Sequence, residues 1–240
     1  PVTPAPITFP DGGLTVLRTP EVHLVFDHGP LGGFALAAHG HADALATYLH
    51  DRFGPVLVGR GTGVYVGAPD FRRFHRGTSA HPTLVLDGAD QSAPSDHPFL
   101  WRTRATATLD HARPEEGFAS AHHDGYAGRG VVHRRAVRVE GPRFTWVDTV
   151  DGAGLHHVAV TLPLAPGLTL DADRAVWDGA RRVGRIALDP RLRWEVITGG
   201  ERPGPGWHAS AYGEWSPATT VCASAVLRAP ATLEGRIELG

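Results

Sequence analysis

Short apolar or β-branched runs, separated by turn dipeptides, constrain this chain more than any other feature. The clearest turns are Asp87-Gly88, Asp124-Gly125, Asp151-Gly152 and Asp178-Gly179. Asp-Gly between alternating apolar residues is typical of tight turns in antiparallel sheets. The strands expected from this pattern are 14–18, 22–26, 44–50, 56–59, 83–86, 100–107, 131–139, 144–149, 156–163, 193–197 and 223–227. The sequence therefore predicts an all-β fold, a large antiparallel β-sandwich (supersandwich) with at most one short helix near 69–75.

Length and charge narrow the alternatives. A chain of 240 residues suits one large all-β domain, and no apolar run reaches the roughly 18 residues of a membrane span. The net charge is −2, so no excess of positive charge favours nucleic acid. Because the chain begins at Pro1 and holds no Met, we expect a further segment upstream, with 1–12 as a linker and 13–240 as the domain.

Histidine is frequent, and its sharpest cluster is His39-Gly40-His41-Ala42-Asp43. If this segment is extended, His39, His41 and Asp43 share one face and can flank a metal ion or a substrate. Ordinary surface or hydrogen-bonded histidines remain the alternative interpretation. A second group, around the turn at 124–125, is interpreted as satisfied polar side chains and comprises His122, His123, Tyr126 and His133.

An arginine-rich segment follows the predicted helix start. Arg72, Arg73 and Arg76 precede a strand that begins near His81. Guanidinium groups bind carboxylates and sulfates through paired hydrogen bonds, which suits an acidic sugar. A solvated arginine patch that caps a loop is the alternative. The chain contains no GxSxG, Walker, CxxC or HExxH motif.

The joint order of several motifs is more specific than any of them alone. These motifs are Phe26-Asp27-His28-Gly29-Pro30-Leu31-Gly32, His39 to Leu45, Gly54 to Val58, Gly61-Thr62 with Tyr65, Arg72 to His81, Asp87 to Ser92, Pro98 to Trp101, His123 to Tyr126, His133-Arg134-Arg135, Gly206-Trp207 and Tyr212-Gly213. In this order the chain resembles the C-terminal β-sandwich domain of the heparinase II/III-like polysaccharide lyases.

The resemblance implies an N-terminal (α/α) toroid domain in the same parent chain, with the active site between toroid and sandwich. It also implies cleavage of a uronic-acid-containing polysaccharide by β-elimination, and a periplasmic or secreted location. The fragment alone is then expected to be inactive, because the toroid supplies further site residues. A catalytically impaired, lyase-like glycan-binding protein of polysaccharide biosynthesis or surface assembly is the alternative function, and a purely structural sandwich is a third.

The resemblance also assigns roles to residues. His39 is implied to face the substrate and take part in proton transfer or charge neutralisation. Tyr65 and the three arginines are expected to bind the acidic polysaccharide. His41 and His81 match ligands of Zn²⁺ in members that carry it.

The sequence departs from the family pattern at the metal position. Gly59 stands where the family has an acidic ligand, and two histidines fall short of the three or four protein ligands of a stable zinc site. Arg60 is expected to supply a fixed positive charge near the histidines instead. Pro82 replaces the family's Asn beside His81 and removes a backbone donor.

Overall fold

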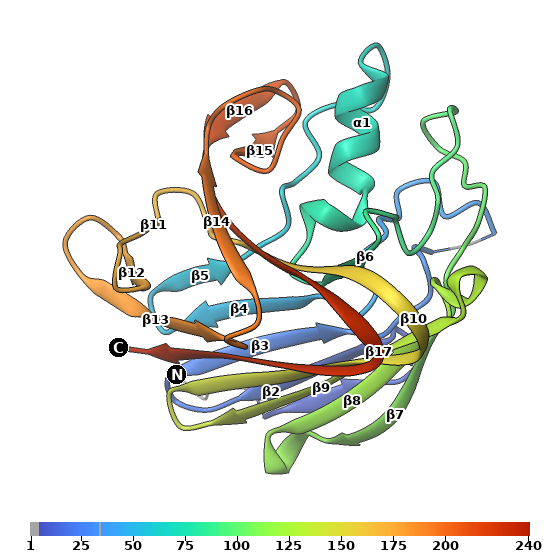
Figure 1. Ribbon diagram of the computed structural model, residues 1–240. Coiled ribbons are helices and arrows are strands. Elements are labelled where there is room, and N and C mark those ends of the chain that lie inside the picture. The colour runs from blue at the N-terminus through green and yellow to red at the C-terminus, as the bar shows by residue number, and fades with distance from the viewer. Residues whose placement is uncertain (1–4, 34) are drawn as a thin grey trace.

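A computed structural model describes residues 5–33 and 35–240. Two antiparallel sheets form most of it, and Figure 1 shows the smaller sheet, with β2, β3 and β4, packed along the larger one. The smaller sheet has the order β1 (Ile7–Phe9), β2 (Leu14–Arg18), β3 (Val22–Asp27), β4 (Thr47–Asp51) and β5 (Gly54–Leu57). The predicted β-sandwich is therefore confirmed.

The larger sheet has ten strands and contains the two longest strands of the chain, β10 and β17. Its main path runs β11, β12, β13, β17, β10, β9, β8 and β7, while β14 pairs with β17 and β6 with β10. The bounds are β6 (Leu84–Leu86), β7 (Ala107–Arg113), β8 (Phe118–His123), β9 (Val131–Glu140), β10 (Arg143–Pro163), β11 (Thr169–Leu170), β12 (Ala175–Trp177), β13 (Arg182–Leu188), β14 (Arg193–Thr198) and β17 (Thr219–Leu239).

Elements outside the two sheets lie near one another. The hairpin of β15 (Trp207–Ala211) and β16 (Glu214–Pro217) stands beside α1 (Pro69–Arg76) in Figure 1. This helix confirms the one expected near 69–75, with Pro69 in its first turn. Short 3₁₀ turns occur at Thr78–Ala80, Pro114–Glu116 and Ala127–Arg129.

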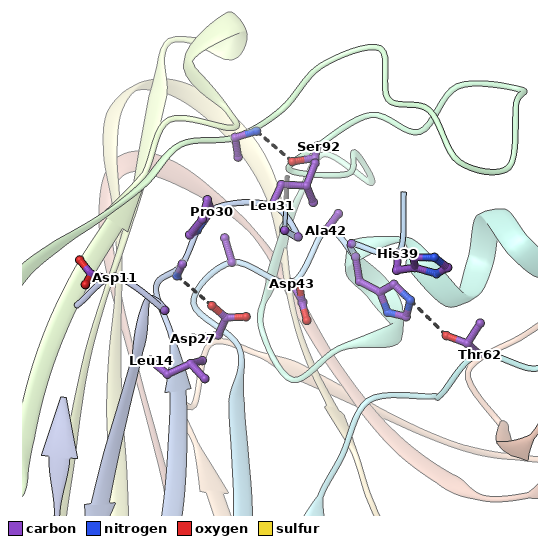
Figure 2. Close-up of a pocket in the computed structure, with 18 residues that line it drawn as sticks. Asp11, Leu14, Asp27, Pro30, Leu31, His39, Ala42, Asp43, Thr62 and Ser92 are labelled. Carbon is purple, nitrogen blue, oxygen red and sulfur yellow. Dashed lines mark hydrogen bonds between the residues drawn. The ribbon is translucent and has the colours of Figure 1, made fainter. Parts of the chain in front are cut away.

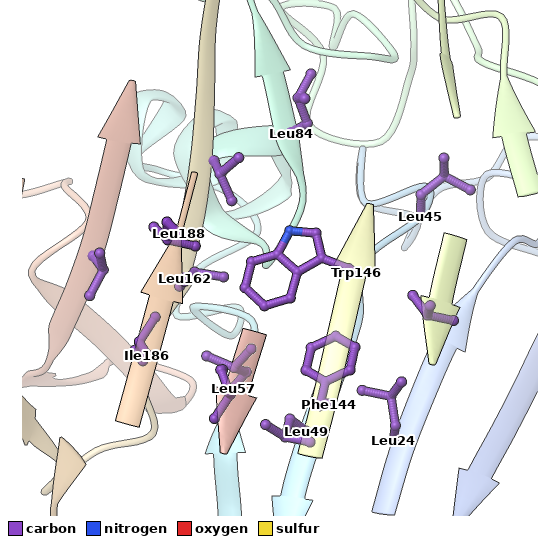
Figure 3. Close-up of a cluster of buried hydrophobic side chains, with 14 of the residues drawn as sticks. Leu24, Leu45, Leu49, Leu57, Leu84, Phe144, Trp146, Leu162, Ile186 and Leu188 are labelled. Atoms are coloured by element: carbon purple, nitrogen blue, oxygen red, sulfur yellow. The ribbon is translucent and has the colours of Figure 1, made fainter. Parts of the chain in front are cut away.

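The core fills the space between the sheets. Leu24 and Leu49 of the smaller sheet meet Phe144, Trp146 and Ile186 of the larger one (Figure 3), and all are buried. Strand β3 alternates buried and half-buried residues, as expected when one face packs inward. This alternation is why the period-2 pattern predicted the fold class correctly.

At two segments the structure contradicts the sequence expectation, and a third segment lies partly outside the described residues. The predicted strand 100–107 is wrong, because its backbone forms a loop and only Ala107 belongs to β7. The turn at Asp151-Gly152 is also wrong, since both residues lie within β10 near a register shift between Val150 and Gly154. Within the expected linker 1–12, residues 1–4 lie outside the described part, and Ile7–Phe9 pairs with β2 as β1.

Candidate active site

A pocket of about 600 Å³ opens where the loops after β3 and β5 meet. Figure 2 shows Asp27 and Asp43 on neighbouring segments of its wall, with His39 and Thr62 on one side. Both carboxylates come from segments that the β3–β4 pairing holds together, because Leu45 N–H donates to the Asp27 carbonyl at 2.8 Å. The pocket therefore combines Asp27 and Asp43, and a third acid, Asp11, with the predicted histidine cluster.

The environment of Asp27 changes the pKa of its carboxyl group. Burial, then the nearby Asp43 carboxylate, raise the pKa of Asp27 to about 7, against the opposing effect of the Gly29 N–H that donates to it at 2.9 Å. Asp27 is therefore partly protonated near neutral pH. Sequence reasoning missed this group, since Asp27 was part of a motif but had no assigned role.

His39 and His41 do not share one face of an extended segment, so that expectation is wrong. The segment is a loop in which the Gly40 N–H donates to the Ala37 carbonyl at 3.0 Å. His39 is exposed, and its ring lies 5.3 Å from the ring of Tyr65 between centroids. His41 turns inward instead. Both still line the pocket.

His41 belongs to a continuous line of hydrogen bonds, the pocket histidine chain, which runs from Thr62 through His41, His81 and Tyr48 to Asp43. Thr62 Oγ1 lies 3.1 Å from His41 Nε2, and His41 Nδ1 lies 3.2 Å from His81 Nε2. The Tyr48 hydroxyl lies 3.4 Å from His81 Nδ1 and donates to Asp43 Oδ2 at 2.7 Å. Because Tyr48 gives its proton to Asp43, its oxygen accepts from His81 Nδ1, and His81 Nε2 then accepts from His41.

Burial sets the charge state of this chain. It lowers the pKa of His81 and, together with the neighbouring His81, holds the pKa of His41 well below its ordinary value. Burial and the Asp43 carboxylate also raise the pKa of Tyr48 well above its usual range. The two imidazoles and the phenol are thus neutral at pH 7, which agrees with alternating donors and acceptors along the chain.

The donor set does not fit the zinc ion that the resemblance implies. A Cβ on Gly59 would lie 3.0 Å from His81 Nδ1, so a carboxylate at position 59 would stand beside this histidine, but glycine supplies none. Asp43 Oδ2 is 3.9 Å from His81 Nδ1 and already accepts from Tyr48. Within residues 5–33 and 35–240 no three His, Cys, Asp or Glu side chains are grouped to hold a metal. Two histidines alone are too few.

Arg60 does not take the place of a metal, so that expectation is wrong. Its side chain is fully buried and points toward β17, where Nη1 donates to the Leu164 carbonyl at 2.9 Å and Nη2 to the Thr219 carbonyl at 2.5 Å. It also donates to Thr220 Oγ1. Satisfying backbone carbonyls inside the sandwich explains the burial of this charge.

The three predicted substrate arginines have different surroundings. Arg76 is buried and donates to four backbone carbonyls of residues 95–100. Arg72 is also buried, donates to the Ala38 and Pro98 carbonyls at 3.1 Å each, and lies over the Tyr65 ring. Arg73 is exposed and pairs with Asp96. Substrate binding by these residues and Tyr65 stays a prediction, and the buried pair also fixes the loop around Pro98.

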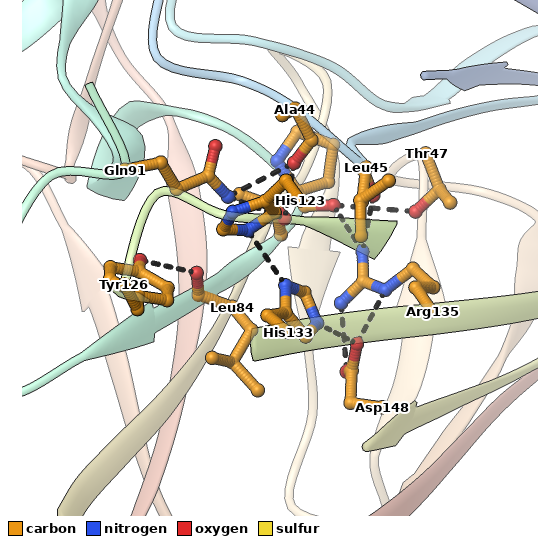
Figure 4. Close-up of polar contacts among 12 residues, drawn as sticks. Ala44, Leu45, Thr47, Leu84, Gln91, His123, Tyr126, His133, Arg135 and Asp148 are labelled. Atoms are coloured by element: carbon orange, nitrogen blue, oxygen red, sulfur yellow. Dashed lines mark hydrogen bonds and ion pairs between the residues drawn. The ribbon is translucent and has the colours of Figure 1, made fainter. Parts of the chain in front are cut away.

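Arg135 binds backbone carbonyls next to two members of the pocket histidine chain, and Figure 4 shows its side chain between Leu45 and Asp148. Its Nη1 donates to the Leu45 carbonyl at 3.0 Å and to the Pro82 carbonyl at 2.9 Å. Leu45 follows Asp43 by two positions and has a φ of 60°, a conformation that costs energy for a side chain of this size. Pro82 follows His81. Arg135 therefore positions the two segments that carry Asp43 and His81.

A second line of histidines reaches the same arginine. In this buried histidine chain, His123 Nε2 lies 3.1 Å from His133 Nδ1, and His133 Nε2 lies 2.8 Å from Asp148 Oδ1. Arg135 binds both oxygens of Asp148 at 2.7 and 2.8 Å. The interpretation of His123 and His133 as satisfied polar residues agrees with these bonds. Arg135 was missed, although it shares the inward face of β9 with His133 and Val137.

Comparison with known proteins places the chain in a family. The family model described as heparinase II/III-like, C-terminal, matches residues 1–234. No curated protein matches.

Solved structures show the same fold. A crystal structure of heparinase III superimposes with a TM-score of 0.75 at 19% identity, over 99% of this chain and 37% of that chain. The heparan sulfate lyase HepC from Pedobacter heparinus superimposes with a TM-score of 0.74 at 15% identity, over 98% of this chain and 36% of that one. The 4-alpha-glucanotransferase of Thermococcus litoralis is more distant, with a TM-score of 0.53 at 10% identity over 94% of this chain and 37% of that chain.

The sandwich thus occurs in different enzymes, so the fold alone does not assign a reaction. The family match is more specific, because it covers nearly the whole sequence, including the His39 loop, position 59 and His81. The chain spans a little over a third of the length of the solved heparinase and lyase structures. On this match, the chain belongs to the heparinase II/III-like C-terminal domain family.

Proposed function

We propose that this chain is the C-terminal domain of a polysaccharide lyase that cleaves a uronic-acid-containing polysaccharide by β-elimination and forms one wall of its active site. The observation that carries the proposal is the placement of His39, which is exposed on the rim of a 600 Å³ pocket, beside an aromatic ring. The other wall is an N-terminal (α/α) toroid of the same parent protein. No helix of the described residues is long and apolar enough to cross a membrane.

The reaction needs a proton acceptor, a group that neutralises the uronate carboxylate, and a proton donor. The base takes the C5 proton, the electron pair forms the C4–C5 double bond, and the C4–O bond breaks as an acid protonates the leaving oxygen. His39 serves in proton transfer or in charge neutralisation at the carboxylate, because imidazole is the commonest proton-transfer group in enzymes and this one is exposed at the pocket. The remaining groups come from the toroid.

The pocket histidine chain has a positioning role in this proposal. Its members hydrogen-bond one another, so none of them is free to exchange a proton with substrate without breaking the line. They hold the loop that carries His39 against the segment of Thr62.

The glycine at position 59 favours one alternative function. The site lacks the carboxylate that the family resemblance implies beside His81, and the pocket holds Asp27 and Asp43, which repel an anionic sugar when ionised. A lyase-like protein that has lost turnover and binds glycan during polysaccharide biosynthesis or surface assembly accounts for both features.

A cleavage assay on the whole natural protein that contains this chain separates the two functions. Heparan-type, alginate-type and bacterial capsule polysaccharides are supplied, and the ultraviolet absorbance of the unsaturated uronate is followed. The lyase proposal expects product from at least one of them. Binding without cleavage supports the glycan-binding alternative, and a folded protein that neither binds nor cleaves any of them contradicts both.

A further inference from the structure

Three aromatic rings from distant segments meet beside His39. The ring of Tyr65 lies 5.8 Å from that of Phe99 and 6.3 Å from that of Tyr212, with interplanar angles of 29° and 19°. The His39 ring is 5.3 Å from Tyr65 and 6.0 Å from Phe99. We call Tyr65, Phe99 and Tyr212 the aromatic row. Because His39 also lines the pocket, the row extends the pocket wall along the surface.

The fold fixes the outermost ring of the row. Tyr212 occupies the turn between β15 and β16. The Ala209 N–H of this hairpin donates to the Arg60 carbonyl at 2.9 Å, and the Gly213 N–H donates to the Gly63 carbonyl at 2.8 Å. The hairpin is therefore bonded on both sides of its turn to the segment that leads to Tyr65, so the two tyrosines keep their spacing.

A tryptophan fastens the same hairpin to α1. A Cβ on Gly63 would lie 2.5 Å from the Trp215 ring, so only glycine lets the ring pack this closely. Trp215 Nε1 donates to His75 Nε2 at 3.2 Å, and its ring meets Phe71 with centroids 5.4 Å apart. These contacts make the hairpin a rigid support rather than a loose turn.

The inner ring is fixed by a different set of bonds. The Phe99 N–H donates to His97 Nδ1 at 3.2 Å, and the surrounding carbonyls accept from the buried Arg76. Trp101 Nε1 donates to the Ala37 carbonyl at 2.9 Å, which ties this segment to the His39 loop. All three rings are thus ordered before any ligand arrives, which lowers the entropic cost of binding.

Exposure and chemistry indicate a sugar ring as the ligand. Tyr212 is 62% exposed, and Tyr65 and Phe99 are half-buried. One face of a pyranose ring presents C–H groups with slight positive charge, which pack against the negative face of an aromatic ring. The carboxylates and hydroxyls of the sugar lie at its edge and remain hydrated or free to bond. Binding sites commonly combine such apolar walls with a few polar groups.

We propose that the aromatic row is a sugar-stacking subsite, which holds a pyranose unit of the acidic polysaccharide next to the unit at His39. This assignment rests on the proposed function and adds Phe99 and Tyr212 to the residues that contact the glycan. The aromatic row binds the C–H face of the pyranose ring, and it does not bind the carboxylate of the sugar.

The test compares Tyr212→Ala with Tyr212→Phe in the whole natural protein. Loss of the ring is expected to raise KM for the cleaved polysaccharide between about twofold and tenfold, with kcat within twofold. Tyr212→Phe keeps the ring and should retain the original KM. Phe53→Ala is the matched control, because Phe53 is also 62% exposed but lies on the β4–β5 turn. Phe99→Ala should act in the same direction as Tyr212→Ala.

The outcomes separate this inference from the lyase function. If the protein cleaves but KM is unchanged in Tyr212→Ala and Phe99→Ala, the subsite is wrong and the function stands. A lower melting temperature in Tyr212→Ala with unchanged KM shows instead that the ring packs against another part of the protein. If the protein binds the polysaccharide without cleaving it, the same fold-changes between variant and parent are expected in Kd. A protein that neither binds nor cleaves contradicts both the subsite and the proposed function.

Discussion

The protein contains two hydrogen-bonded pairs of histidines, each of which leads to an aspartate with different surroundings. In each pair, a ring nitrogen of one histidine lies 3.1 to 3.2 Å from a ring nitrogen of the other, and the line of hydrogen bonds ends at an aspartate. The buried histidine chain ends at Asp148, which is fully buried and bound through both oxygens by Arg135. The pocket histidine chain ends at Asp43, which accepts from Tyr48 and shares the pocket with Asp27.

The endings decide what each chain can do. The Arg135 guanidinium and the His133 hydrogen bond hold the pKa of Asp148 well below its ordinary value, so that carboxylate stays ionised at all ordinary pH values. In the pocket, burial and then the nearby Asp43 carboxylate instead raise the pKa of Asp27 to about 7. The buried chain is thus fixed in charge and structural, whereas the pocket can change its charge near neutral pH.

The largest effect on stability is expected when Asp148, at the end of the buried histidine chain, loses its charge. Asp148→Asn leaves the Arg135 charge buried without its counter-ion, so the free energy of unfolding should fall by about 3–5 kcal/mol. Urea unfolding measures this. The control is the surface pair between Arg143 of β10, the strand of Asp148, and Glu238 of β17, which lie 3.7 Å apart, and Glu238→Gln should cost less than about 1 kcal/mol. Equal losses in the two variants would contradict the comparison.

A smaller effect of opposite sign is expected in the pocket. The folded pKa of Asp27 lies above the unfolded value, so the folded state retains a proton that the unfolded state releases, and stability falls as pH rises from about 4 to about 7. Asp27→Asn removes this penalty. The variant should be more stable than the parent at pH 8 by roughly 1–2 kcal/mol, allowing for solvent screening, and equal to it at pH 3.5. Thermal melts of both proteins at the two pH values measure this. If the stability difference between variant and parent is the same at both pH values, the pKa of Asp27 is not raised.

The buried histidine chain should also make the free energy of unfolding depend on pH in mild acid. Burial and the neighbouring His133 hold the pKa of His123 well below 6.5, so below pH 6.5 the unfolded state takes up a proton that the folded state refuses. Stability attributable to His123 should then drop by up to about 1.4 kcal/mol per pH unit. In His123→Gln the slope between pH 6.5 and 5 should be shallower than in the parent. Parallel slopes would show that His123 does not titrate as described.

A gain of function is expected at position 59. Gly59→Asp places a carboxylate beside His81 and supplies the third ligand that the pocket histidine chain lacks, so the variant should bind Zn²⁺ and its melting temperature should rise with added zinc. Gly59→Ala introduces the same 3.0 Å contact with His81 but no donor. Zinc binding by titration calorimetry in both variants, or in neither, would contradict this account.

The sequence predicted the sandwich because its strands carry their own pattern. Alternation in 22–26 and 131–139 indicates one inward face, and β3 and β9 follow it. It failed at 100–107, where an apolar start is followed by Arg102 and Arg104 and the backbone bonds to neighbouring loops. The sequence also predicted a turn at Asp151-Gly152 in the middle of β10. The register shift inside this long strand carries an Asp-Gly dipeptide, which is typical of turns.

The site was predicted less completely, for a physical reason. The motif order located His39, His41, His81 and Gly59, and the structure brings His41, His81 and Gly59 together. Tyr48, Asp27 and Arg135 were missed because their roles depend on contacts between segments far apart in the chain. Arg135 was nonetheless detectable, since a charged residue on the inward face of a predicted strand requires a buried partner.

The most direct test of the lyase account is the rate of unsaturated uronate formation by the whole natural protein and its His39→Gln variant, each with its melting temperature. His111→Gln is the matched control, because His111 is an exposed histidine of β7 that does not line the pocket. If His39 transfers a proton or neutralises charge, its variant should lose about 100-fold or more in rate with an unchanged melting temperature, while His111→Gln stays within about twofold. A His39→Gln protein that cleaves within twofold of the parent rate would contradict the account.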